Sequence, residues 1–336
     1  MLLGAAAAYL LFRNEGVGFA LLIGAILAPT DAALGMPIFN NPRVPSRIRR
    51  ALNIESGLND GIATPLVTLF LALAIEELSS THGGWIFGAL SDIGRAIVAG
   101  VVVGFLGGRL FSMAAAKGWT TQTAQRIGNL ALALAVYWAA LAIGGNGFIA
   151  AFVGGLVFGA VTNYGLREAT DFTDEFGAVL STVVWRLFGV SIVVPLIRDF
   201  DVKALIFAIF ALTLARMIPV AISLIGVGMR RDTVLVMGWL GPRGLASVVF
   251  MLIAVETFHE AGEGAGKLTA MVGWTITLSV VLHAVTAAPL ADWYAARLKA
   301  AAPDAPELLP IPGLSAHHAP GKHRSFIHSP GDNPGI

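Results

Sequence analysis

The chain has 336 residues, of which 56% are hydrophobic and only 13% are charged. Its mean hydropathy is +0.76, and a soluble domain carries roughly twice as much charge. The net charge of +1 gives no basis for nucleic-acid binding, and the absence of cysteine excludes disulfides, thiol catalysis and cysteine-ligated metal. We therefore expect an all-α membrane protein without a cofactor.

Apolar segments follow one another along the chain. We count ten: 1–12, 17–39, 51–74, 85–113, 123–143, 148–161, 176–197, 204–228, 233–255 and 268–290. The first is too short to cross a bilayer, which takes about 17 residues or more. We interpret it as the truncated remnant of a longer helix.

The second segment, 17–39, is interrupted by Pro29, Thr30 and Asp31. Proline removes a backbone donor and leaves a carbonyl group without its helical partner. Broken helices with free carbonyls are how transporters coordinate cations inside the membrane. The alternative is a simple proline kink with a buried, satisfied aspartate, but a carboxylate on the next segment favours a binding site.

The third segment, 51–74, carries the polar cluster Asn53-Ile54-Glu55-Ser56-Gly57-Leu58-Asn59-Asp60. At 1.5 Å per residue, Asp60 lies about 13 Å from the start of this helix, near the middle of a bilayer. A charge at that depth costs at least about 2.5 kcal/mol, so it normally faces a bundle interior or a wet cavity and marks an ion or proton path. We predict that this helix places Asp60 on such a path.

The ninth segment, 233–255, has a matching interruption at Gly241-Pro242-Arg243-Gly244. Two interrupted helices in corresponding positions predict an inverted repeat with crossing breaks, and the site is expected where the breaks cross. The repeats would be residues 1–78 and 201–298. A linker helix and scaffold helices would occupy 79–200.

Arginines inside apolar segments are costly unless they are paired. Arg216 lies near the middle of the eighth segment and Arg186 within the seventh. We favour Arg216 as the partner of Glu55, in a structural ion pair. Arg243 is expected to offset either the helix-end dipoles or Asp31.

Lysine and arginine are concentrated in alternate loops, which predicts that these loops are cytoplasmic. The residues concerned are Arg43, Arg47, Arg49, Arg50, Lys117, Arg126, Arg167, Arg230, Arg231, Arg297 and Lys299. The C-terminus is therefore expected in the cytoplasm. The tail 299–336, rich in proline, glycine and histidine, is predicted to be disordered.

Taken together, these motifs resemble those of the bacterial sodium/proton exchangers of the NhaP and NHE type. The resemblance covers residues 1–298 and is carried, in family order and spacing, by Ala28-Pro29-Thr30-Asp31, the basic loop 43–50, Glu55 to Gly61, Arg216 and Gly241-Pro242-Arg243-Gly244. It implies the antiporter fold, with a six-helix ion-carrying core and a dimer scaffold. It also implies that about three N-terminal helices are missing.

Carried over to this chain, the resemblance implies that Asp60 is the ion-binding carboxylate, with Ser56 and the backbone carbonyl of Thr30 as further ligands. Asp31 would shape the break, and Asn59 would be the neutral member of an Asn-Asp pair. Hard cations such as sodium prefer oxygen ligands, and a buried carboxylate can hold either a proton or a cation. No metal is expected besides the transported cation.

The function that follows is antiport of Na⁺, or of K⁺ or Li⁺, against H⁺ across the inner membrane, in the service of pH homeostasis. Because Asn59 does not titrate, we predict electroneutral one-for-one exchange. The protein would be a lipid-embedded, multi-pass homodimer and not an enzyme.

Two other classes remain open. A non-transporting or degenerate fragment of such an antiporter is favoured by the missing helices and opposed by the intact polar cluster. An intramembrane hydrolase could use Asp31 and Asp60 as a carboxylate dyad. The sequence lacks Gly-x-Gly-Asp and His-Glu-x-x-His patterns, and such an enzyme would leave both helix breaks unexplained.

Overall fold

The computed structural model describes residues 1–31, 33–39, 41–78, 84–162, 166–299 and 305–309. All regular elements in these ranges are helices, which confirms the predicted all-α class. Five of these helices are long and apolar enough to cross a membrane, or six if a bent pair at the N-terminus counts as one span. The predicted number of ten segments also includes broken and short helices, and it stays a prediction.

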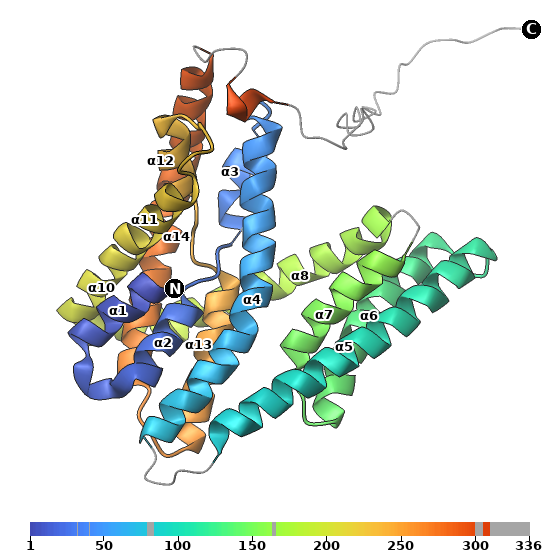
Figure 1. Cartoon of the computed structure of the whole chain (residues 1–336), viewed down its shortest axis with the longest axis horizontal. Helices are drawn as coiled ribbons and strands as arrows, with labels where there is room; N and C mark the ends of the chain where they lie inside the picture. Colours follow the sequence, from blue (N-terminus) through green and yellow to red (C-terminus); the bar gives the residue numbers. More distant parts are fainter. Residues whose placement is uncertain (32, 40, 79–83, 163–165, 300–304, 310–336) are drawn as a thin grey trace, which may run out of the picture.

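The helices form two groups that lie side by side (Figure 1). The core group contains α1 (Leu2–Leu11), α2 (Gly16–Ile26), α3 (Met36–Phe39), α4 (Ser46–Leu78), α10 (Val202–Leu212), α11 (Leu214–Ser223), α12 (Arg231–Trp239), α13 (Leu245–Glu260) and α14 (Gly266–Leu298). The scaffold group contains α5 (Trp85–Ala116), α6 (Gln122–Ala142), α7 (Gly147–Val161) and α8 (Leu166–Phe188). The π-helical turn η3 (Gly189–Val193) and α9 (Val194–Arg198) lead from the scaffold group back to the core group.

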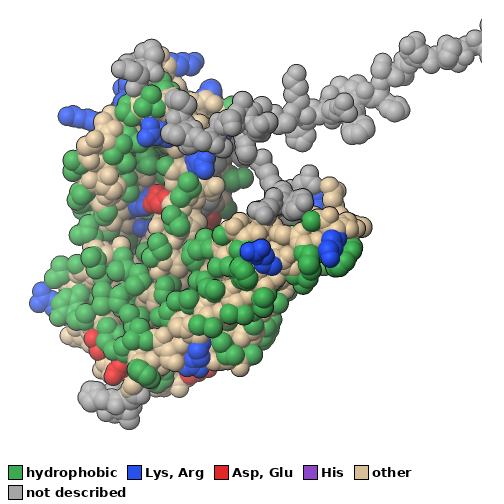
Figure 2. Space-filling view, turned by 45° about the vertical axis from the view of Figure 1, so that its right-hand side comes forward, with side chains coloured by type: hydrophobic (Ala, Val, Ile, Leu, Met, Phe, Trp, Pro, Cys, Tyr) green, Lys and Arg blue, Asp and Glu red, His purple; other side chains and the backbone are tan. Residues whose placement is uncertain are grey.

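Apolar side chains fill the core group and also cover its outside. Ile23 of α2, Phe207 of α10, Met251 of α13 and Met271 of α14 are fully buried in one cluster. Figure 2 shows hydrophobic side chains spread over the middle of the molecular surface. So many exposed apolar side chains suit a lipid environment, because contact with lipid tails carries no hydrophobic free-energy cost.

Both predicted interruptions are present. The chain after α2 has no regular structure over residues 27–31 and then forms the short helices η2 (Ala33–Gly35) and α3. The second interruption separates α12 from α13 at residues 240–244. The breaks contact each other, because the backbone N–H of Asp31 donates to the carbonyl oxygen of Pro242 at 2.8 Å.

A third interruption was not predicted. The eighth apolar segment is divided into α10 and α11 at Thr213, whose backbone angles of φ −102° and ψ −88° are not helical. Because α11 begins at Leu214, directly after this division, Arg216 lies in the first turn of α11.

Residues 305–309 differ from the expected disordered tail. Pro306–Leu308 form a 3-10 turn, η4, and the side chain of Glu307 is buried there. It accepts hydrogen bonds from the Arg230 backbone N–H at 2.8 Å and from the Thr233 hydroxyl at 2.6 Å. Burial opposes ionisation of Glu307, but these hydrogen bonds outweigh it and hold its pKa below the usual value. The rest of the tail that was predicted to be disordered, residues 300–304 and 310–336, lies outside the described residues.

Candidate ion-binding site

The polar cluster lies on α4 as predicted, although the helix is longer than 51–74. It begins directly after Pro45, and Pro65 is accommodated inside it. Residues four apart share one helix face, so Ser56 and Asp60 lie along one line and Glu55 and Asn59 along the neighbouring one. Both lines face the two breaks.

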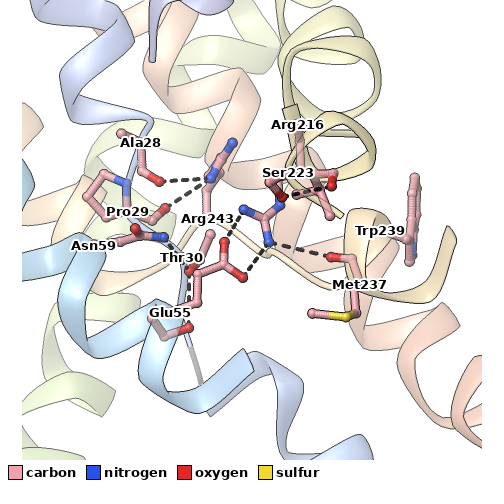
Figure 3. A network of polar contacts seen from close by, with 12 residues as sticks. Ala28, Pro29, Thr30, Glu55, Asn59, Arg216, Ser223, Met237, Trp239 and Arg243 are labelled. Carbon is pink, nitrogen blue, oxygen red and sulfur yellow. Dashed lines mark hydrogen bonds and ion pairs between the residues drawn. The ribbon is translucent and has the colours of Figure 1, made fainter. Parts of the chain in front are cut away.

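Thr30, in the first break, is the point where α4 and the broken helix meet. Its buried hydroxyl lies 3.1 Å from the Ser56 hydroxyl and accepts a hydrogen bond from the Asn59 amide at 3.3 Å (Figure 3). The Asn59 side chain is therefore engaged with the first break. Thr30, Ser56 and Asn59 together form a patch of oxygen-bearing side chains next to Asp60.

Asp60 faces a cavity of about 370 Å³. The walls come from both breaks, from α4 and α13, and from α7 of the scaffold group; they include Pro29, Thr30, Asp31, Gly61, Thr64, Phe148, Phe152, Gly244 and Phe250. Within the described part of the chain, no hydrogen bond reaches the Asp60 carboxylate. Its oxygens are thus available to bind a proton or a cation.

The other aspartate, Asp31, is already committed to backbone groups. One carboxylate oxygen accepts from the Ala33 N–H at 2.8 Å, and the other accepts from the N–H of Leu245, the first residue of α13, at 3.1 Å. A negative charge is favourable at a helix N-terminus. The contact is so close that a Cβ atom at Gly244 would come within 1.9 Å of the carboxylate, so only glycine fits there.

Arg243 makes the reciprocal contact from the second break to the first. Its guanidinium group donates to the carbonyl oxygens of Ala28 and Pro29, both at 3.2 Å (Figure 3). Cations stabilise free carbonyls at a helix C-terminus. Of the two partners expected for Arg243, its side chain contacts the helix-end carbonyls, and no hydrogen bond joins it to Asp31 among the described residues.

Glu55 and Arg216 are in direct contact. One guanidinium nitrogen is paired with Oε1 of Glu55, and the other donates to Oε2 at 3.0 Å and to the Met237 carbonyl oxygen at 3.5 Å. Only 9% of the Arg216 side chain is exposed. Arg186, the other arginine considered as a partner, is exposed on α8 of the scaffold group.

Sequence reasoning missed the small polar residues that complete the breaks. The Ser247 hydroxyl donates to the free carbonyl of Ile26 at 2.7 Å, and the Ser279 hydroxyl accepts from the Arg243 backbone N–H at 2.7 Å. His283 Nε2 contacts the Trp239 carbonyl oxygen at 2.8 Å, at the end of α12. For the two serines, the available signal was their presence inside apolar segments. His283 was not missed, because a histidine inside the last apolar segment predicts a satisfied interior side chain, in agreement with its contact to Trp239.

The described residues contain no group of three or more His, Cys, Asp or Glu side chains that could hold a metal ion. What the arrangement offers instead is one free carboxylate beside hydroxyl oxygens, within reach of a cavity. Such a set suits a proton or a monovalent hard cation that binds and leaves.

Known proteins resemble this chain over most of its length. A family model described as "Sodium/hydrogen exchanger, transmembrane" matches residues 1–293. The chain belongs to the sodium/hydrogen exchanger family. This match confirms the resemblance inferred from the motifs. Together with the long apolar helices, it also confirms that the chain is a multi-pass membrane protein.

Among other exchangers, the chain is similar to the K(+)/H(+) antiporter NhaP of Alkalimonas amylolytica, with 27% identity over 318 residues. That match covers 94% of this chain and 53% of the relative. The probable Na(+)/H(+) antiporter 2 of Methanocaldococcus jannaschii is also 27% identical, over 81% of this chain and 69% of its own length. The chain thus spans about half to two thirds of the length of these two relatives.

A solved structure shows the same fold. The sodium proton antiporter MjNhaP1 from Methanocaldococcus jannaschii, determined at pH 8, superposes with a TM-score of 0.69 at 20% sequence identity. The superposition covers 87% of this chain and 75% of the other. The predicted antiporter fold is therefore confirmed.

Proposed function

We propose that this protein exchanges a monovalent cation for H⁺ across a membrane by binding either ion at Asp60. The observation that carries the proposal is the position of a free carboxylate in a cavity where the breaks of two helices contact each other. Relatives named as Na⁺/H⁺ and as K⁺/H⁺ antiporters support the reaction class. We place Na⁺ first, with K⁺ and Li⁺ as alternatives.

Ser56 and the backbone carbonyl of Thr30 would complete the cation site. The hydroxyl groups of Thr30 and Ser56 already lie 3.1 Å apart, so both residues are held at the edge of the site. When a proton occupies Asp60, the charge of the carboxylate is removed and the cation is no longer attracted. Proton and cation therefore exclude each other at one group.

The remaining charged residues stay fixed during the cycle. Glu55 is held by Arg216, and Asp31 by the N-terminus of α13. With both Asp31 oxygens occupied by backbone donors, a carboxylate dyad of Asp31 and Asp60 is disfavoured. This is why we prefer a transporter to an intramembrane hydrolase.

The wider setting is part of the same proposal. Residues 1–78 and 201–298 would move as the ion-carrying core, against a scaffold built from 79–200. The scaffold would form a homodimer, in an inner membrane, with the C-terminus in the cytoplasm. The exposed apolar residues Val179, Val183 and Leu187 along α8 support a lipid or subunit contact there.

The test is Asp60→Asn in everted membrane vesicles with a pH-sensitive dye. Asparagine keeps the size of the side chain but cannot exchange a proton, so addition of Na⁺ or K⁺ should produce no proton movement. Asp92→Asn, at an exposed aspartate of α5 paired with Arg95, is the matched control and should transport like the unaltered chain. Cation-dependent proton movement in Asp60→Asn would show that another group carries the ion.

A further inference from the structure

The core and scaffold groups are joined by a side-chain hydrogen bond outside the ion site. Asn146 stands just before α7, and its amide nitrogen donates to the hydroxyl of Thr68 on α4 at 3.1 Å. Its amide oxygen accepts the N–H groups of Phe148 and Ile149, at 3.0 and 3.1 Å, and so caps α7. Because the cap fixes the side chain to the scaffold, Asn146 cannot follow α4 if the core moves.

Thr68 belongs to a row of oxygens that begins at the ion site. Asp60, Thr64 and Thr68 are spaced four residues apart and therefore share one face of α4. The Thr64 hydroxyl donates to the Asp60 carbonyl at 2.9 Å, and the Thr68 hydroxyl donates to the Thr64 carbonyl at 3.0 Å. The row extends from the cavity that Asp60 faces to the side chain of Asn146.

A second contact of α7 lies at the level of Asp60. The ring of Phe152 rests on Gly61, where an added Cβ would come within 2.1 Å of the ring. Phe148, between Asn146 and Phe152 on α7, lines the cavity as well. α7 and its cap thus meet α4 through the Phe152 ring on Gly61 and the Asn146–Thr68 hydrogen bond, and both aromatic rings line the cavity that Asp60 faces.

We propose that the Asn146–Thr68 hydrogen bond is a latch that closes the cavity at the end of α4 nearest α5. The inference rests on the proposed function, because exchange requires that one site open alternately toward the two sides of the membrane. A shift of α4 along α7 by one residue, about 1.5 Å, already breaks a hydrogen bond of this length. Once it opens, the Thr64 and Thr68 oxygens line the route by which the ion leaves toward this end.

Cysteine cross-linking tests the latch directly, because the chain contains no cysteine of its own. In Thr68→Cys/Asn146→Cys, oxidation should join core to scaffold and lower the exchange rate in proteoliposomes at least tenfold, and a reducing agent should restore it. A cross-linked pair that exchanges as fast as the reduced pair overturns the proposal. So does a pair that forms no disulfide under oxidation, because the two positions would then not be in contact.

The chain offers a closely matched control. Asn129 donates to Thr173 through the same two side-chain atoms and at the same 3.1 Å, but this bond joins α6 to α8 within the scaffold group. In Asn129→Cys/Thr173→Cys, oxidation should leave the exchange rate unchanged. If it stops exchange equally, the cross-links act by general rigidification, and the latch is wrong.

A second measurement does not depend on transport. A single cysteine, Thr64→Cys, is labelled with a membrane-impermeant maleimide added from the side of Asn146, with and without Asn146→Ala. Removing the latch should raise the labelling rate several-fold, and an unchanged rate overturns the proposal. If the unaltered chain exchanges no cation, the proposed function fails, while this labelling experiment still decides on the latch.

Discussion

Arg216 is a charged residue of the site that depends on one partner for the compensation of its charge. It is almost fully buried, and the Glu55 carboxylate is the charge that compensates it. A buried ion pair adds little net stability compared with apolar residues, but removal of one partner leaves a buried charge without compensation. Arg216 and Glu55 therefore depend on each other.

We predict that Glu55→Gln destabilises the protein by about 3–5 kcal/mol, because the Arg216 charge is left buried and unpaired. The measurement is the thermal melting of detergent-solubilised protein, in which unfolding is monitored by size-exclusion chromatography. Glu55→Gln/Arg216→Gln removes both charges and should recover much of the loss. If Glu55→Gln alone has the same melting temperature as the unaltered protein, the pairing of Glu55 with Arg216 is contradicted.

Charged residues of the site were easier to predict than neutral ones. A carboxylate or guanidinium group inside an apolar segment requires a partner. Arg216 could therefore be favoured over Arg186 as the partner of Glu55, because its segment was assigned to the second repeat. The Ser247 hydroxyl is satisfied by the backbone of a distant helix, and nothing in the sequence specifies which carbonyl it will find. Asn146 was missed for the same reason, since its partner Thr68 is 78 positions away.

At the level of helices, the packing of α4 against α7 depends on glycine. Gly61 lies beneath the Phe152 ring, whereas Gly57, one turn earlier on α4, has nothing within 4 Å of an added Cβ. The same substitution at these two positions therefore has opposite consequences. In a helix, alanine is intrinsically more favourable than glycine by about 1 kcal/mol.

We predict that Gly61→Ala forces Phe152 away from α4, lowers the melting temperature and slows exchange several-fold. Gly57→Ala is the matched control and should melt at the same temperature as the unaltered protein or higher. Gly61→Ala/Phe152→Leu, with a smaller side chain over the added methyl group, should recover part of the exchange rate. Equal effects of the two alanines would mean that α7 does not pack here.

Two helix breaks were predictable from proline and its neighbours, although proline does not always break a helix, since Pro65 lies inside α4. Pro29 and Pro242 each lack a backbone donor, and each lies in an interruption that the structure shows. The division at Thr213 has no such marker, because threonine occurs in regular helices as well. The start of α8 at Leu166 was also missed, since its first residues are too polar to count as an apolar segment.

At the level of the whole molecule, the number of titrating groups where the two breaks meet would decide whether the proposed transport moves net charge. Glu55 is held by Arg216, Asp31 caps α13, and Asn59 carries an amide that does not titrate. Under the proposed function, Asp60 alone would exchange its proton. One cation would then be traded for one proton.

We predict that an imposed membrane potential leaves the exchange rate in proteoliposomes unchanged. Movement of one net charge would couple the rate to about 2.3 kcal/mol per 100 mV. A variant with a second carboxylate, Asn59→Asp, is the informative comparison and should become sensitive to voltage. Clear acceleration of the unaltered chain by voltage would reveal a second titrating group, with Asp31 the first to examine.

The reciprocal contacts of Asp31 and Arg243 between the two breaks also have a consequence for synthesis of the chain. Asp31 finds its partner on Leu245 only after 214 further residues have been made, and Arg243 reaches Ala28 after 215. At about 5 to 20 residues per second, the first broken helix waits on the order of 10 to 40 s without the groups that complete it. During that time its free carbonyls depend on water or on the membrane-insertion machinery, so a nascent chain that stalls before Arg243 carries an unfinished broken helix.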